Sequence, residues 1–186
     1  APSGQTRPHR RSSPGPPSDS LRARLGPADA PVIVSPRTVS RLYRHDVVLD
    51  AAAEVGRRRS PGPIVVVSAV GADHRTLAGL RERAISAGVA DRLRILEGLA
   101  PDELPDLYRI GDVIVSVPET DSFAVTLLEA MACARPVVVT DVPAVGPGMA
   151  GLDPGGSPLV APLREVAPAR SVYKGARLFG GPVTFT

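Results

Sequence analysis

Residues 116–140 have the sequence SVPETDSFAVTLLEAMACARPVVVT, which predicts a strand end, a polar turn, a helix and a second strand. The helix, expected over residues 122–133, carries two carboxylates eight positions apart, Asp121 at its start and Glu129 further along. Asp121 is well placed as a helix N-cap, which alone would account for it. Glu129 lies among apolar residues that surround the helix almost completely, so it needs hydrogen-bonding partners if the helix is buried.

The segments on either side of this stretch repeat the same alternation of strand and helix. Short runs rich in Val and Ile, apolar on both faces, are each followed by a helical pattern. Such strands form a parallel sheet covered by helices on both sides, and right-handed crossovers then give a doubly wound, Rossmann-like α/β fold. Strands are expected at residues 31–35, 63–70, 92–97, 112–117 and 136–140, and helices at 40–59, 72–87, 101–110 and 122–133.

The turns at the carboxyl ends of these strands are the expected place for a site, because ligands of doubly wound sheets bind there. Arg37 follows the first strand and Asp121 follows the fourth. The sequence therefore predicts that any site draws on these turns and not on the opposite edge of the sheet.

The chain divides into three zones by composition. Residues 1–30 are rich in Pro, Ser and Arg without apolar periodicity, so we expect a disordered lead-in. They hold five Arg and two Asp, which accounts for the whole formal net charge of +3. Residues 31–162 are expected to form one Rossmann-like domain, with a weak strand near 158–161, and residues 163–186 an irregular tail.

Several function classes are excluded by what the sequence lacks. A single cysteine, Cys133, cannot form an intramolecular disulfide, and no apolar run reaches the ~18 residues of a membrane-spanning helix. These features and the polar first residues predict a cytoplasmic protein. Cys133 is alone and the three histidines are scattered, so no metal site is expected. No cofactor is expected either. Gly146, Gly148 and Gly151 have dinucleotide-motif spacing, but Pro147 and the Gly/Pro-rich residues that follow cannot open a helix.

Two segments together carry a family resemblance. Residues 121–138 are DSFAVTLLEAMACARPVV, and residues 98–113 contain GLAPDEL, then LY, then DV. They resemble the patterns E-G-F-G-x-x-x-L-E-A-M-A-C-G-x-P-V-V and G-x-x-x-x-E-L-x-x-L-Y-x-x-A-D-V of retaining glycosyltransferases of family 4, also called group 1. The resemblance covers residues 31–145 and implies the C-terminal, donor-binding domain of a two-domain GT-B fold.

The resemblance implies that a nucleotide-diphosphate sugar is bound as donor substrate, with no metal. It assigns Glu129 to the ribose hydroxyls, Asp121 to sugar hydroxyls near the anomeric carbon, and Arg37 to the diphosphate leaving group. A preorganised guanidinium there stabilises the charge that develops as the glycosidic bond breaks. The remaining implied contacts are the backbone of Ser122, Phe123 and Ala124 with the sugar and distal phosphate, and Leu99 and Ala100 with the base.

Some positions depart from the family pattern. Asp121 is one methylene shorter than the usual Glu, and Ala124 and Ala134 replace glycines. Ala134 falls where the chain leaves the helix, a position that favours left-handed backbone, so alanine there costs about 1 kcal/mol.

The usual phosphate-binding Lys of the family has no equivalent in this chain. Tyr43 stands near its place, and Arg41 or Arg44 is the expected substitute. The neighbouring His45 is expected to be a solvent-exposed helix residue, and His74 a surface residue at the start of the next helix.

We therefore expect the donor-binding half of a hexosyltransferase, truncated at both ends, that binds nucleotide-sugar weakly and transfers nothing without an acceptor domain. Peripheral contact with the inner face of a membrane would be made by that missing domain. The alternative is a Rossmann-like nucleotide-binding or regulatory module, which would not need Asp121. A third hypothesis, a basic tail on nucleic acid, is disfavoured because no aromatic residues are interleaved with the arginines, and no nucleic-acid partner is expected.

Overall fold

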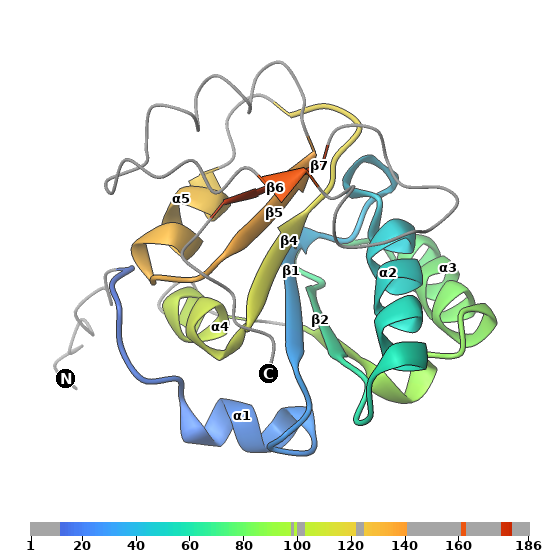
Figure 1. Cartoon of the computed structure of the whole chain (residues 1–186). Helices are drawn as coiled ribbons and strands as arrows, with labels where there is room; N and C mark the ends of the chain where they lie inside the picture. The colour runs from blue at the N-terminus through green and yellow to red at the C-terminus, as the bar shows by residue number, and fades with distance from the viewer. Residues whose placement is uncertain are drawn as a thin grey trace, which may run out of the picture.

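The computed structural model describes residues 12–97, 99, 103–121, 125–140, 161–162 and 176–179. At its centre lies a sheet with the strand order β3-β2-β1-β4-β5-β7-β6 (Figure 1). The strands from β3 to β5 are parallel, which confirms the predicted doubly wound α/β sheet. The strands are β1 (Val32–Thr38), β2 (Ile64–Ser68), β3 (Leu93–Leu96), β4 (Val113–Ser116), β5 (Val137–Thr140), β6 (Ala161–Pro162) and β7 (Ala176–Phe179).

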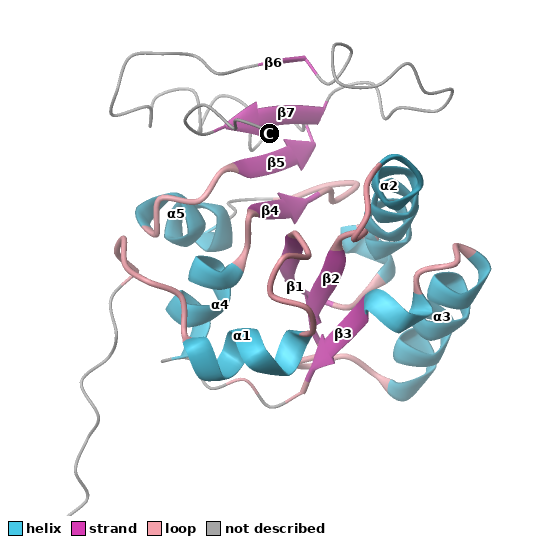
Figure 2. Ribbon diagram, turned by 60° about the horizontal axis from the view of Figure 1, so that its bottom comes forward, coloured by secondary structure: helices cyan, strands magenta, loops and turns pink. Residues whose placement is uncertain are grey.

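The helices lie on both faces of the sheet, with α2 and α3 on one side and α1, α4 and α5 on the other (Figures 1 and 2). They are α1 (Asp19–Leu25), α2 (His45–Arg58), α3 (His74–Ser86), α4 (Leu104–Ile110) and α5 (Val125–Ala132), with short 3₁₀ turns η1 (Arg41–Tyr43) and η2 (Ala90–Arg92).

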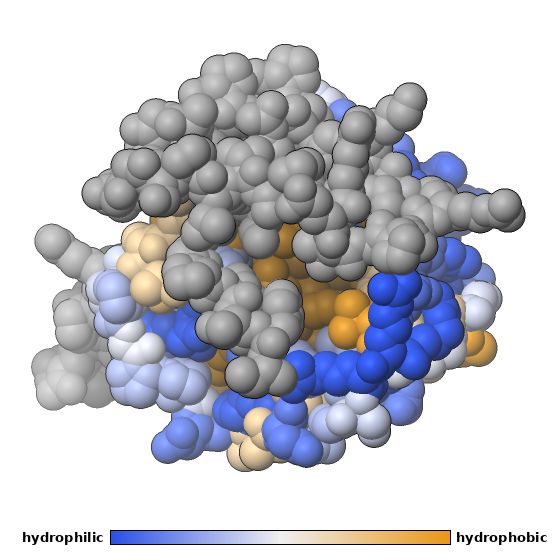
Figure 3. All heavy atoms as spheres, in the orientation of Figure 1, coloured by the Kyte–Doolittle hydropathy of each residue, from blue (hydrophilic) through white to orange (hydrophobic). Residues whose placement is uncertain are grey.

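Aliphatic side chains fill both interfaces between sheet and helices. Successive residues of a strand point to opposite faces, and in β2 Val66 packs on the α4 side while Val65 and Val67 pack on the α2 side. Every residue of β2 is buried, as expected for a central strand of a sheet covered on both faces. Figure 3 shows mostly hydrophilic residues on the described part of one face, with apolar residues visible towards its centre.

The lead-in is ordered where the structure describes it, so the prediction of disorder is wrong for residues 12–30. Ser18 caps α1 by accepting a hydrogen bond from the backbone N–H of Leu21 at 3.4 Å. Leu21 and Leu25, four residues apart on one helix face, are both buried in the core beside α4. Two leucines within one short helix were too few to show periodicity in the sequence, yet tertiary contacts bury both.

The sheet continues beyond the predicted parallel part. β7 lies within the range expected to be an irregular tail, and it pairs antiparallel with β5, while β6 pairs antiparallel with β7. Strand formation here depends on a partner about 40 residues earlier in the chain. Short-range patterns could not predict it for that reason. The glycine motif at residues 146–151 lies outside the described residues.

The helix expected over residues 40–59 is divided in two. Arg44 has φ 45° and ψ 48°, a left-handed conformation that ends η1 and precedes α2. This break separates η1, which follows β1, from α2. No helix in the described ranges is long and apolar enough to cross a membrane.

Candidate functional site

The candidate site lies where β1 and β4 are neighbours. Arg37 is near the carboxyl end of β1, and Asp121 follows the end of β4. The strand order reverses direction between these two strands, since β2 and β3 follow on one side and β5 on the other. Doubly wound sheets bind their ligands at such a switch point.

Arg37 and Asp121 form an ion pair across this junction. Nη2 of Arg37 lies 3.2 Å from Oδ1 of Asp121, and the side chains are only 14 % and 6 % exposed. Nη1 of Arg37 donates a longer hydrogen bond, 3.4 Å, to Oγ1 of Thr126 in the first turn of α5. The structure thus brings together two residues that are 84 positions apart and were each predicted as site residues.

Tyr43 is a third partner of the same guanidinium. Its ring centroid lies 4.3 Å from Cζ of Arg37, and its hydroxyl accepts a hydrogen bond of 2.5 Å from Nη2. The ring is half-buried, so the cation lies over an aromatic face that is partly withheld from water. The sequence placed Tyr43 near a phosphate site but gave no sign of this contact.

Glu129 is held from a different side, by Tyr108 of α4. The Tyr108 hydroxyl donates to Oε2 of Glu129 at 2.7 Å, and the tyrosine is fully buried. Burial, together with the Glu129 carboxylate, raises the pKa of Tyr108 well above its usual value, so the phenol remains a donor. The sequence did contain a signal: a tyrosine in a short apolar helix must find an acceptor for its hydroxyl.

Glu129 lies on the same helix, α5, as Thr126, one of the partners of Arg37. Thr126, which contacts Arg37, and Glu129 are three residues apart and therefore on one helix face. The positive charge of Arg37 also acts on Tyr108, where it opposes part of the pKa rise. Arg37 thus contacts Asp121 and Thr126 directly, and its charge reaches Tyr108, the hydrogen-bond partner of Glu129.

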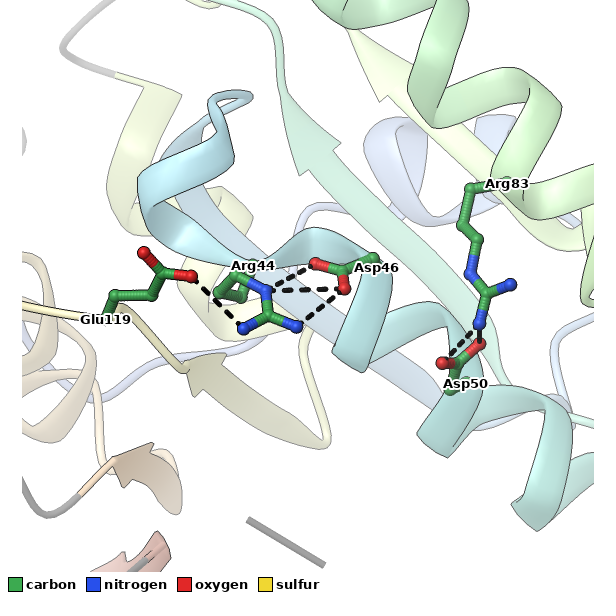
Figure 4. Close-up of polar contacts among 5 residues, drawn as sticks. All are labelled: Arg44, Asp46, Asp50, Arg83 and Glu119. Atoms are coloured by element: carbon green, nitrogen blue, oxygen red, sulfur yellow. Dashed lines mark hydrogen bonds and ion pairs between the residues drawn. The ribbon is translucent and has the colours of Figure 1, made fainter. Parts of the chain in front are cut away.

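The loop that carries Asp121 is tied to its surroundings at several points. The backbone N–H of Glu119 donates to the carbonyl of Leu42 at 3.0 Å, and Oγ1 of Thr140 donates to the carbonyl of Pro118 at 2.9 Å. Arg44 bridges Glu119 at 3.2 Å and Asp46 at 2.9 Å (Figure 4). Arg44, one of the two arginines expected to replace a phosphate-binding lysine, is therefore committed to two carboxylates.

Figure 4 also shows a second ion pair, which joins helices α2 and α3 and does not belong to the candidate site. Arg83 of α3 contacts both carboxylate oxygens of Asp50 on α2 (Figure 4). Both side chains are exposed, which limits the stabilisation that this pair supplies.

His45 contradicts its prediction as an exposed residue, because only 3 % of it is accessible. It is the first residue of α2, and its side chain is among those that this helix buries. Burial lowers the pKa of His45, a shift that the backbone of Arg37 and the charge of Asp46 oppose. His74, in contrast, is exposed at the start of α3, as predicted.

The exit from α5 has the predicted geometry. Ala134 has φ 57°, in the left-handed region. Its N–H donates to the carbonyl of Met131 at 2.8 Å, and the N–H of Arg135 donates to that of Ala130 at 3.1 Å. This is the Schellman pattern of a helix C-terminus, formed with alanine where glycine is preferred.

The other predicted contact residues are only partly placed. Leu99 is half-buried and packs against the core cluster that contains Tyr108. Among the described residues, no three His, Cys, Asp or Glu side chains are grouped to hold a metal ion. Ala100, Ser122, Phe123 and Ala124 lie outside the described residues.

Comparison with known proteins agrees with this architecture. The family model described as glycosyl transferases group 1 matches residues 18–146, and the chain belongs to this family of GT-B glycosyltransferases. The D-inositol 3-phosphate glycosyltransferase of Rhodococcus erythropolis is 36 % identical over 133 residues, which are 69 % of this chain and 30 % of that protein. The chain thus spans less than a third of the length of this relative.

Two solved structures share the fold. HepE of Anabaena, in complex with UDP-glucose, superposes with a TM-score of 0.60 at 22 % identity over 72 % of this chain and 35 % of that one. The C-terminal domain of the group 1 glycosyl transferase LpcC from Francisella tularensis gives 0.54 at 20 % identity and covers 69 % of each chain. These similarities confirm the expected Rossmann-like fold.

Proposed function

We propose that this chain is the donor-binding part of a glycosyltransferase that takes a hexosyl group, with retention, from a nucleotide-diphosphate sugar. The observation that carries the proposal is the Arg37–Asp121 pair at the switch point of the sheet. Membership of the group 1 glycosyltransferases supports it. The chain covers 30 % of the length of the D-inositol 3-phosphate glycosyltransferase, so transfer to an acceptor is proposed of the protein as a whole.

Each charged residue has a role in this proposal. Glu129, with one carboxylate oxygen bound by Tyr108, presents its other oxygen to the ribose hydroxyls. Asp121 accepts hydrogen bonds from sugar hydroxyls near the anomeric carbon, and Arg37 contacts the diphosphate. Ser122, Phe123 and Ala124 bind the sugar and distal phosphate through their backbone, and Leu99 and Ala100 contact the base.

Arg37 has the largest role in the proposed chemistry, because it stabilises the leaving group. When the bond from the anomeric carbon to the phosphate oxygen breaks, its electron pair goes to the diphosphate. A guanidinium already fixed by Tyr43, Asp121 and Thr126 stabilises this charge without reorganising. Bidentate contact with phosphate oxygens suits arginine in particular.

A thermal-shift screen with UDP-, GDP- and ADP-sugars tests the proposal. Ligand at 100 times its Kd stabilises the native state by about 2.7 kcal/mol, which raises Tm by about 5–10 °C in a domain of this size. We expect donors of one base to produce this shift. If none of the three series moves Tm, the proposed function is wrong.

The matched variants are Glu129→Ala and Glu82→Ala. Glu129→Ala should abolish the shift while far-ultraviolet circular dichroism stays unchanged, since the ribose contact is lost and the fold is kept. Glu82 is exposed on α3, so Glu82→Ala should retain the full shift. An undiminished shift with Glu129→Ala would exclude the assigned ribose contact.

A further inference from the structure

Tyr43 contacts Arg37 both with its aromatic ring and with its hydroxyl. Its ring lies beneath the guanidinium, 4.3 Å from Cζ, and its hydroxyl accepts from Nη2 at 2.5 Å. Tyr43 is the last residue of η1, immediately before left-handed Arg44.

The partners of Arg37 come from two segments of the chain. Asp121 and Thr126 both belong to the β4–α5 side of the site. Tyr43 belongs to η1, and its hydroxyl accepts from Nη2, the same nitrogen that contacts Oδ1 of Asp121. Without Tyr43, the guanidinium would keep the contacts with Asp121 and Thr126 but would lose the ring that supports its face.

Tyr43 also differs from Asp121 in charge. A carboxylate that holds an arginine neutralises much of its field, whereas an aromatic ring attracts the cation through its quadrupole and leaves the net charge in place. A guanidinium has five N–H donors, and the three contacts with Tyr43, Asp121 and Thr126 use at most three of them. Donors thus remain for an anionic ligand.

We propose that Tyr43 is the positioning residue for Arg37. Its ring supports the face of the guanidinium and its hydroxyl accepts from Nη2, so that the remaining N–H groups meet the diphosphate of the donor. The inference rests on the proposed function, in which Arg37 contacts that diphosphate. Tyr43 itself does not touch the ligand in this arrangement and acts only through Arg37.

The test uses the 186-residue chain and compares diphosphates with nucleosides by isothermal titration calorimetry. UDP, GDP and ADP are each titrated beside uridine, guanosine and adenosine. Tyr43→Leu removes ring and hydroxyl, and we expect it to weaken the bound diphosphate about tenfold and its nucleoside less than twofold. Tyr43→Phe keeps the ring, so the diphosphate should weaken only about threefold.

A double-mutant cycle with Arg37→Ala separates positioning from direct contact. In the Arg37→Ala background, Tyr43→Leu should cause no further loss of diphosphate affinity, because Tyr43 has nothing left to position. A further fivefold or larger loss there, or equal losses for diphosphate and nucleoside, would overturn the inference while the proposed function stands. A wild-type chain that binds none of the six compounds overturns both.

Leu42→Ala is the matched control. Leu42 lies beside Tyr43 on η1, its side chain is 38 % exposed, and its bond to Glu119 uses only the backbone. We expect unchanged affinity for the diphosphate in this variant. If Leu42→Ala loses as much as Tyr43→Leu, any disturbance of η1 has the same effect and the specific role of Tyr43 is refuted.

Discussion

Tyr108 of α4 donates a 2.7 Å hydrogen bond to Oε2 of Glu129 on α5, and this bond joins the two helices beneath the candidate site. The tyrosine is fully buried, so its hydroxyl has little freedom to turn elsewhere. The carboxylate is therefore fixed in direction before any ligand arrives. Fixed polar groups of this kind bind ligands without first having to be ordered.

Tyr108→Phe should weaken nucleoside binding about tenfold and lower the free energy of unfolding by about 1–2 kcal/mol, because a hydrogen bond to a half-buried carboxylate is lost. Calorimetry with the nucleoside and urea unfolding measure the two effects. In a Glu129→Gln background the binding effect of Tyr108→Phe should shrink, since the charge it orients is absent. An unchanged nucleoside affinity for Tyr108→Phe alone would contradict the orienting role.

Asp121→Asn should raise affinity for a nucleoside diphosphate about threefold to tenfold, because Arg37 loses the carboxylate with which a diphosphate competes. The sugar-bearing donor should lose its advantage over the diphosphate, since a sugar contact is weakened. Competition titrations with UDP-glucose and UDP give both quantities. Glu119→Gln, in the same loop and 61 % exposed at the side chain, is the control and should change neither.

Ala134→Gly should stabilise the protein by about 0.5–1 kcal/mol, because glycine adopts the left-handed conformation of this position without steric cost. Ala134 is exposed, so no packing is lost. Urea unfolding measures the difference. Ala132→Gly, two residues earlier and also exposed but within α5, should instead destabilise by about 1 kcal/mol, and a shared sign for the two variants would count against this account.

Stability should fall as the pH decreases below about 6.5, the usual pKa of histidine, because His45 has a lowered pKa in the folded protein. Between the unfolded and folded pKa values only the unfolded chain binds the extra proton, so acid favours unfolding. The contribution of His45 to the free energy of unfolding is complete above the pKa that this histidine has in the unfolded chain. It is lost as the pH falls towards the pKa of His45 in the folded protein, by at most about 1.4 kcal/mol per pH unit.

Chemical unfolding at a series of pH values between 5 and 8 measures how the free energy of unfolding depends on pH. His45→Gln should reduce the slope of that dependence. The control His74→Gln changes an exposed histidine on α3 and should leave the slope as in the wild type. A slope that His45→Gln does not alter would show that other groups carry the acid sensitivity.

The sequence by itself determined the parallel sheet, and it predicted the turns at which the candidate site lies. Apolar runs such as PIVVVSAV specify strands buried on both faces, and this information is local. The exit at Ala134 and the acids Asp121 and Glu129 were likewise predicted from their spacing and neighbours. All of these features can be predicted from residues that are close to one another in the sequence.

Only the tertiary structure decided which groups contact these acids. Tyr108 is 21 residues from Glu129 and Arg37 is 84 from Asp121, and no local pattern encodes such a distance. The burial of His45, the packing of α1 and the pairing of β7 with β5 depend in the same way on distant partners. These features share one physical reason. Side-chain burial and strand pairing stabilise the fold only when segments far apart in the chain come into contact.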